Sequence, residues 1–390
     1  MVVTAAIWAL FVAATLRPPF RHGPLGFAVF VVTMTFNEIP LLVLVAFVVS
    51  MGFAGRPDGV PWTVVGVVLA GATVAGLIWL QVRARTARTA LEGGLDQGLG
   101  RQRRTARRGG GSTGQLPPTP WWPGVLLPFQ RRTRGVVRKR NLSYGPDPAH
   151  RVDLYRGQES SRGTVTGRPV LIHLHGGGFV SGSKSRESIT MLNHLAAHGW
   201  LCLSANYRLR AAGQHPNPLI DTKRLIAWIR ENSDELGADP SQVFLAGCSA
   251  GAHLAVSAAL TPNAAEFQPS FEAAETSVAG VLALYGYLGP RTSDPSSSPA
   301  SLARADAPPM LVVHGANDTA VSASSTRAVV AALRHRSRSP ILFVELPHTQ
   351  HSFDRFASVR SRMTATAAEA FLSWALHPRT DSHADTTPER

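Results

Sequence analysis

Cysteine is almost missing from this sequence. The 390 residues include only Cys202 and Cys248, each within an apolar stretch. Two such residues supply neither the several bridges of a disulfide-stabilised secreted domain nor a cysteine-rich metal cluster. We therefore expect a fold without disulfides, in a reducing compartment, and a function that uses neither a metal nor a cofactor.

Acidic residues are also few, with 25 Asp and Glu against 39 Lys and Arg, for a formal net charge of +14. Most of the excess lies between Arg83 and Arg140, where fourteen basic residues face only Glu92 and Asp96, a local net charge of +12. An arginine run invites a nucleic-acid interpretation. Directly after an apolar stretch, however, attraction to anionic lipid explains the same charge. We expect the segment to lie on anionic lipid, and we expect no nucleic-acid partner.

Charge is nearly absent from the first eighty residues, which contain the apolar runs Val2–Leu16, Leu25–Phe53 and Val60–Leu80. A helix needs about 20 residues to cross a bilayer, so the first run is short and the other two are long enough. No basic residues precede the first run, which disfavours a cleaved signal peptide. Within the second run, Glu38 either marks a functional site or lies beside Pro40 at a kink.

The loops between these runs predict the orientation. Arg17 and Arg21 follow the first run, Arg56 is offset by Asp58 after the second, and many arginines follow the third. The positive-inside rule then places the N-terminus outside and everything after the third run in the cytoplasm. We expect a multi-pass protein of the cell membrane whose domain from residue 134 onward is cytoplasmic. If the first run does not cross, the other two form a hairpin with the same outcome.

The next segment, residues 83–133, is expected to be a basic linker. Ala84–Leu99 fits an amphipathic helix, and the arginine- and glycine-rich run Arg101–Gly114 fits a disordered chain. Pro117–Phe129 contains two tryptophans and is too apolar for a plain linker. It rests in the bilayer interface, covers the active site, or packs as an arm on the following domain.

Strand and helix patterns alternate from residue 134 to residue 378, which predicts a mostly parallel sheet with helices on both faces. The predicted strands are Val136–Tyr144, Arg151–Tyr155, Val170–Leu174, Trp200–Asn206, Val243–Gly247, Val278–Tyr285, Met310–Val313 and Ile341–Leu346. The predicted helices are Ser188–His198, Pro218–Asn232, Ala250–Leu260, Ser322–Arg334 and Thr364–Leu376. The first two strands are expected to form an antiparallel edge pair. The predicted domains are a transmembrane region of two to three helices (1–82), the linker (83–133), the catalytic domain (134–378) and a disordered tail (379–390).

A G-x-S-x-G pattern at Gly247–Gly251 follows one of these buried strands and opens a helix. Such a sharp turn holds the central residue, Ser249, in a strained conformation that exposes a nucleophile. Side chains at Gly247 and Gly251 would collide with neighbouring backbone. The N–H of Ala250 lies at the start of the helix, where it can face a developing oxyanion.

A second glycine run, His175-Gly176-Gly177-Gly178, ends the buried strand at Val170–Leu174. Consecutive glycines let backbone N–H groups approach a substrate carbonyl without interference from a Cβ. We expect Gly177 and Gly178, with Ala250, to form an oxyanion hole, and His175 and Gly176 to support it.

An acid and a base are expected after the serine in the order Ser, Asp, His. Asp318 follows the strand at Met310–Val313, and His351 follows the strand at Ile341–Leu346. A neutral imidazole takes the serine proton, and the carboxylate holds the imidazole in the right tautomer. His348 is the alternative base, and the weaker alternative acids are Asp306 and Asp354.

These motifs carry a resemblance. HGGGF, NYRL, GCSAG, HGAND and HSF look like the hormone-sensitive-lipase-type family of α/β-hydrolases. The stretches DTKRLIAWIRENSDELGADP and LTPNAAEFQPSFEAAETSVAG are similar to actinobacterial membrane-anchored carboxylesterases and lipases. The resemblance covers roughly Val136–Leu376. It implies the α/β-hydrolase fold with eight strands, and ester hydrolysis with Ser249 as nucleophile and Asp318 and His351 as its partners.

The sequence departs from the family pattern in two places. Ala252 stands where the family usually has a second glycine, and one methyl group there is expected to be tolerated. The relatives also carry a longer cap insertion where this chain has only Gly286–Pro309. The pocket over Ser249 is therefore open, or it is roofed by Pro117–Phe129.

The sequence thus predicts a membrane-tethered serine carboxylic-ester hydrolase that acts on lipophilic acyl esters. An amidase or N-deacylase would use the same triad and remains an alternative. A membrane scaffold with a lapsed hydrolase fold is a second alternative, although none of the four catalytic elements is broken.

Overall fold

The computed structural model of the chain describes residues 1–20, 23–54, 59–106, 116–118, 120, 122–129, 133–158 and 166–376, with the backbone alone over 101–106. The disordered tail expected at 379–390 lies outside the described residues. So does most of the arginine- and glycine-rich run that was expected to be disordered.

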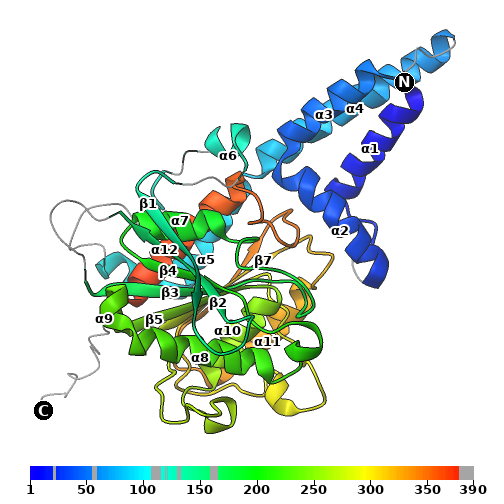
Figure 1. The fold of residues 1–390 in the computed structure, drawn as a ribbon. Coiled ribbons are helices and arrows are strands. Elements are labelled where there is room, and N and C mark those ends of the chain that lie inside the picture. Colours follow the sequence, from blue (N-terminus) through cyan, green and yellow to red (C-terminus); the bar gives the residue numbers. More distant parts are fainter. Residues whose placement is uncertain are drawn as a thin grey trace, which may run out of the picture.

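An eight-stranded mixed sheet forms the centre of the molecule, in the order β1-β2-β4-β3-β5-β6-β7-β8 (Figure 1). The strands β1 and β2 form the antiparallel edge pair expected from the sequence, β2 is also antiparallel to β4, and all remaining pairs are parallel. The strands are β1 Val136–Ser143, β2 Arg151–Gly157, β3 Arg168–Leu174, β4 Leu201–Ala205, β5 Ala238–Cys248, β6 Gly280–Leu284, β7 Met310–Gly315 and β8 Ile341–Leu346.

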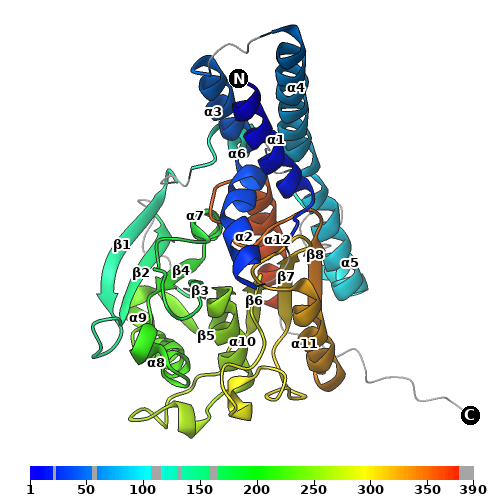
Figure 2. The same ribbon diagram turned by 90° about the vertical axis from the view of Figure 1, so that its right-hand side faces the viewer.

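Helices cover both faces of the sheet because both faces of its central strands are apolar. In β3, Leu171 packs into one core while Ile172 and Leu174 pack into the other, as the two-residue period of a strand requires. One core contains α5, α7 and α12, and the other contains α8, α10 and α11 (Figures 1 and 2). The helices of the sheet domain are α7 Ile189–Ala197, α8 Asn217–Glu231, α9 Ser233–Leu236, α10 Ala250–Leu260, α11 Ala323–Arg336 and α12 Val359–Ala375.

The amphipathic helix expected at Ala84–Leu99 is present as α5 (Thr86–Ala106), but it is not a linker. Its leucines, spaced four residues apart, are buried in the same core as α12 and β8. Glycine permits the close contact: a Cβ added at Gly94 would lie 2.3 Å from the Val344 side chain, and one at Gly98 would lie 2.3 Å from Leu342. The packed domain therefore includes α5, N-terminal to the boundary at residue 134 that the sequence suggested.

The apolar N-terminal region forms four helices, α1 Val2–Leu16, α2 Gly23–Glu38, α3 Pro40–Gly52 and α4 Val60–Arg83. α1, α3 and α4 extend away from the sheet domain, whereas α2 folds back onto it (Figure 2). The run expected to be one span at Leu25–Phe53 is thus two helices, bent by 100° at a break before Pro40. Of the two alternatives for Glu38, its position at the end of α2 agrees with a kink.

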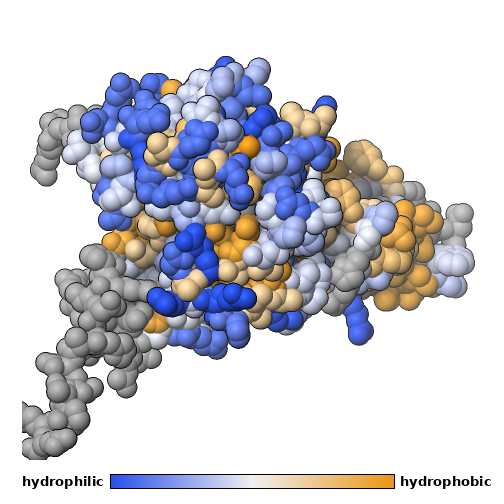
Figure 3. Space-filling model, turned by 90° about the horizontal axis from the view of Figure 1, so that it is seen from below, coloured by the Kyte–Doolittle hydropathy of each residue, from blue (hydrophilic) through white to orange (hydrophobic). Residues whose placement is uncertain are grey.

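By length and composition, one described helical stretch is long and apolar enough to cross a membrane. It runs from Val60 to Gly100 and consists of α4 and the following part of α5. The bent pair α2–α3 would make a second if it counts as one span, and α1 is shorter. Large exposed apolar side chains are concentrated on these helices, and they colour that end of the molecule as hydrophobic surface in Figure 3. α1 packs tightly against α4, and glycine permits the close contact: a Cβ added at Gly76 would lie 2.3 Å from the Val12 side chain.

Candidate active site

Ser249 lies in the turn between β5 and α10, with φ 52° and ψ −112°. This left-handed backbone region is strained for a side chain larger than glycine, and such strain is a recurrent property of nucleophile turns. The flanking glycines are required by space: a Cβ at Gly247 would lie 2.2 Å from the Gly251 carbonyl oxygen, and one at Gly251 would lie 2.1 Å from that of Leu174. The local sequence therefore fixes the turn in the way expected.

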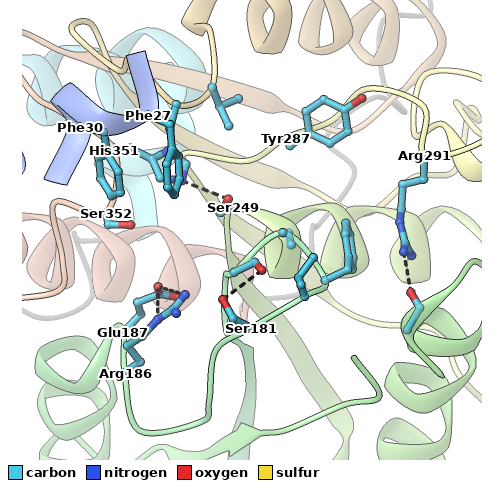
Figure 4. A pocket seen from close by; sticks show the side chains of 18 of the residues that line it. Phe27, Phe30, Ser181, Arg186, Glu187, Ser249, Tyr287, Arg291, His351 and Ser352 are labelled. Carbon is cyan, nitrogen blue, oxygen red and sulfur yellow. Dashed lines mark hydrogen bonds and ion pairs between the residues drawn. The ribbon is translucent and has the colours of Figure 1, made fainter. Parts of the chain in front are cut away.

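The three residues expected to form a triad lie together at the carboxyl edge of the sheet. His351 Nε2 is 3.0 Å from Ser249 Oγ (Figure 4). His351 Nδ1 is 2.7 Å from Asp318 Oδ2. Asp318 and His351 are only 5% and 6% exposed. A hydrogen-bonded chain of this order leads from a buried carboxylate to a serine hydroxyl, and it can draw the hydroxyl proton onto the imidazole.

The Asp318 carboxylate is held in its charged form. Its Oδ1 accepts hydrogen bonds from the backbone N–H groups of Ala320 and Val321, at 2.9 and 2.7 Å, and His314 Nε2 lies 3.1 Å from Oδ2. Burial by itself would raise the pKa of Asp318, but His351 and the hydrogen bond from His314 together hold it well below its ordinary value. The carboxylate therefore remains available to orient His351 at neutral pH.

The alternative acids and base lie elsewhere. Asp306 is exposed and paired with Arg304, and Asp354 is buried, where it accepts hydrogen bonds from Ser188 and Tyr285. His348 lies on the same loop as His351, and its backbone carbonyl accepts a hydrogen bond from Asn37 at 3.0 Å. It is the ring of His351 that the fold brings to the serine.

The glycine run forms a loop beside Ser249, with positive φ at Gly177 (121°) and Gly178 (62°). Both residues line the same cavity as Ser249 and Ala250. The Gly176 N–H is already bound to Glu187 Oε2 at 2.6 Å, so it is occupied. His175 is stacked on Tyr207, with ring centroids 4.5 Å apart, and burial lowers its pKa to about 4. His175 is therefore a neutral support for the loop.

The cavity over Ser249 has a volume of about 780 Å³, and α2 forms one of its walls. Phe27 and Phe30 of α2 line it, and the Phe30 ring meets the His351 ring edge to face at a centroid distance of 5.5 Å (Figure 4). Tyr287 and Arg291, from the segment Gly286–Pro309, line another part. The charged side chains on the lining are Arg186, Glu187, Arg210, Arg291 and Arg355.

No sequence pattern predicted this wall, and one alternative placed Pro117–Phe129 over the cavity as a roof. That assignment is wrong, because Pro117, Leu127 and Phe129 line a different cavity of about 690 Å³ beside α7 and α12. The short helix α6 (Trp122–Leu126) packs there so closely that a Cβ at Gly124 would lie 2.8 Å from the Val359 nitrogen. The segment is a packing arm, which was another of the alternatives.

A signal for the docking of α2 was present in its polar residues. Glu38 is 3% exposed, accepts a hydrogen bond from Ser358 Oγ at 2.6 Å, and lies 3.2 Å from Arg360 Nη1. Asn37 is 2% exposed and donates to the His348 carbonyl. Buried polar groups of this kind need partners, and here the partners belong to the sheet domain.

One group of side chains outside the Ser249 cavity has a spacing that suits a metal ion. His194, His198 and Glu369 offer ligand atoms within 4.8 Å of one another, on α7 and α12. His194 Nε2 is 2.7 Å from Glu369 Oε2, so a hydrogen bond already accounts for the closest of these contacts.

Comparison with known proteins gives the family. The BD-FAE family model matches residues 152–292. The chain is 33% identical to the probable carboxylic ester hydrolase LipM of Mycobacterium tuberculosis, over 95% of this chain and 92% of that protein. The chain belongs to the hormone-sensitive-lipase-type α/β-hydrolases. Membership makes this protein a carboxylic ester hydrolase.

A second relative and a solved structure agree with this family assignment. It is 35% identical to the esterase LipC of Mycobacterium tuberculosis, over 62% of this chain and 66% of that protein. Among solved structures it is similar to the apo form of Thermogutta terrifontis esterase 2, with a TM-score of 0.53 and 23% identity, over 61% of this chain and 94% of that one. The structural likeness supports the α/β-hydrolase fold.

Proposed function

We propose that this esterase hydrolyses carboxylic esters through a Ser249–His351–Asp318 triad. The observation that carries the proposal is the unbroken chain of contacts, 3.0 Å from Ser249 Oγ to His351 and 2.7 Å from His351 to Asp318, at the floor of a cavity. Each residue follows a different parallel strand, so the arrangement requires the whole sheet.

In this mechanism His351 Nε2 takes the proton of Ser249 as Oγ attacks the ester carbonyl. The N–H groups of Gly177, Gly178 and Ala250 stabilise the oxyanion that forms, and His351 then returns the proton to the leaving alcohol. A water molecule, deprotonated by His351, releases the acid from the acyl-enzyme. Asp318 holds the imidazole and balances its charge while it is protonated.

We also propose that the enzyme is tethered to the membrane and acts on lipophilic acyl esters. Support comes from the exposed apolar side chains of α1, α3 and α4 and from the Phe27–Phe30 wall of the cavity. An acyl chain would lie against this wall and reach Ser249 from the bilayer. The arginines around α5 would contact anionic lipid and keep the catalytic domain on the cytoplasmic side.

Substitution of the serine tests the chemistry. The full-length chain should be used, in detergent, because α2 and α5 both pack on the sheet domain. Ser249→Ala is expected to abolish hydrolysis of p-nitrophenyl esters, a loss of roughly 10⁵- to 10⁶-fold in kcat, and to abolish labelling by a fluorophosphonate. Ser352→Ala, on the same cavity lining, is the matched control. Substantial activity in Ser249→Ala would refute the proposal.

The membrane proposal needs its own measurement. Full-length protein expressed in a bacterial host is expected to stay with the membranes after carbonate extraction. A cysteine introduced at Ser324, exposed at the start of α11, is expected to react with an impermeant maleimide only after the membrane is opened. Release by carbonate, or labelling of intact cells, would contradict the tether or the orientation respectively.

A further inference from the structure

Both loops that carry the acid and the base are tied together by one buried amide, the side chain of Gln350. Its Oε1 accepts hydrogen bonds from the backbone N–H of Thr319, at 2.8 Å, and of His351, at 2.9 Å. Thr319 is the residue that follows Asp318, and His351 carries the proposed catalytic imidazole. Gln350 is 2% exposed, so water does not compete for these bonds.

The other end of the amide reaches into α2. Gln350 Nε2 donates to Thr33 Oγ1 at 2.9 Å and to Thr319 Oγ1 at 3.1 Å. The Thr319 hydroxyl in turn donates to the carbonyl of Gly26, also on α2, at 2.9 Å. Thr33 completes the set by donating to Val29 within its own helix at 2.8 Å. Every donor and acceptor of the carboxamide is therefore used.

A buried polar network of this kind fixes the relative position of its members, because any displacement leaves a buried donor or acceptor without a partner. Here the members are backbone groups beside Asp318 and His351. The position of both catalytic side chains thus depends on an amide that is itself held by Thr33, more than three hundred residues away in the chain.

From this geometry we infer that Gln350 and Thr33 are positioning residues for hydrolysis, and that docked α2 is a working part of the active site. The inference rests on the triad proposed above. Thr33 is not among the described residues that line the cavity, although its hydroxyl also lies 3.3 Å from the carbonyl oxygen of Phe30, which does line it. Its effect on the loops of Asp318 and His351 would pass through Gln350. α2 would then have two roles, as a wall through its phenylalanines and as a support through its threonine.

Thr33→Val tests this inference, because it removes the hydroxyl and keeps the size of the side chain. For a short acyl ester, kcat is expected to fall about 10- to 100-fold, the cost of a small misplacement of catalytic groups, with KM changed less than about twofold. The rate of fluorophosphonate labelling is expected to fall by the same factor, while the final extent of labelling stays complete.

Two matched variants separate positioning from a general effect on the helix. Thr33→Ser keeps the hydroxyl and is expected to restore most of kcat. Thr35→Val removes an equivalent hydroxyl that bonds Val31 within the same helix on its exposed side, and is expected to behave as the parent protein. Thermal unfolding of each variant, followed in the same detergent, identifies any that fails to fold.

A second substitution keeps the test decisive. Gln350→Leu is expected to lower kcat at least as much as Thr33→Val, and the double variant is expected to be no worse than Gln350→Leu alone, because both act through one network. If Thr33→Val equals Thr35→Val in kcat and labelling rate, or changes KM alone, the inference is wrong. Activity retained by Ser249→Ala would instead overturn the proposed function on which it rests.

Discussion

The two sides of the Ser249 cavity are built in different ways. The sheet side consists of loops at the carboxyl ends of β5, β7 and β8, where Ser249, Asp318 and His351 meet. The other side is a single helix, α2, from an apolar region that otherwise extends away from the domain (Figure 1). The sheet side contains the groups proposed to react, whereas α2 contributes a hydrophobic wall and hydrogen bonds to the proposed support.

The comparison between α2 and α4 shows why only one of the apolar helices docks in this way. α4 turns valines such as Val64, Val67 and Val68 outward, each more than half exposed. α2 carries Thr33, Asn37 and Glu38, and all three are buried against the sheet domain. Thr73 of α4 is also buried, but its hydroxyl bonds the Leu69 carbonyl of its own helix. What distinguishes α2 is that its polar side chains have partners in the sheet domain.

The largest effect is expected on the sheet side. Asp318→Asn should lower kcat by about 10⁴-fold, because the amide stabilises the wrong tautomer of the imidazole. His351 and His314 hold the pKa of the Asp318 carboxyl group below its ordinary value. The carboxylate is therefore charged at every pH above that ordinary value, and it is protonated only when the pH falls through the lowered pKa. The defect should therefore be equally large at pH 6, 7 and 8.

Asp306→Asn is the control for this measurement, because Asp306 is exposed and paired only with a neighbouring arginine in the described structure. It is expected to retain full activity. If kcat falls as much in Asp306→Asn as in Asp318→Asn, Asp318 is not the acid of the triad.

The next largest effect is expected where α2 is anchored. Arg360→Met should lower the free energy of unfolding by about 3–5 kcal/mol, because it leaves Glu38 buried without its charged partner. Chemical unfolding of the full-length protein in detergent measures this change. The double variant Glu38→Leu with Arg360→Met should regain part of the stability, since no unpaired charge remains. If the double variant is less stable than Arg360→Met, the pair is not the anchor.

A smaller effect, confined to substrate choice, is expected from the wall. Phe30→Ala should raise KM for a long-chain ester about 10-fold, equivalent to about 1.4 kcal/mol of lost contact. The short acetyl ester, which does not reach the wall, should be affected far less. Phe53→Ala, at the exposed end of α3, is the control. An equal change for both chain lengths would place the acyl chain elsewhere in the cavity.

The smallest effect is expected on α4. Val67 is 61% exposed, on a helix that extends away from the sheet domain (Figure 2). Val67→Ala should therefore change the free energy of unfolding by no more than about 0.5 kcal/mol and leave kcat unchanged. Parallel assays with Thr33→Val make this the lower end of the comparison. A loss of activity in Val67→Ala comparable to that of Thr33→Val would mean that the apolar helices act as one unit, and that the docking of α2 is not special.

Much of the sheet side followed from local sequence. The strands after which Ser249, Asp318 and His351 lie are mostly apolar runs, with Glu345 as the exception in β8. The carboxyl ends of parallel strands meet at one edge, so these three positions predict a shared site. The glycines on either side of Ser249 were predictable for a similar reason, because a sharp strand-to-helix turn leaves no room for a Cβ. These features depend on neighbours in sequence or on the regular geometry of a sheet.

What the sequence did not determine was the partner of each apolar helix. A helix that crosses a bilayer and a helix that covers a pocket can both be apolar over most of their length. The run Leu25–Phe53 therefore predicts one span, whereas the structure divides it into α2 and α3. The leucines of α5 likewise predicted an amphipathic helix without saying that β8 would face it. Only the tertiary structure decided these pairings, because they join residues hundreds of positions apart through contacts such as Thr33 to Gln350. Polar side chains in an apolar run indicate that partners are needed, but the local pattern does not identify them.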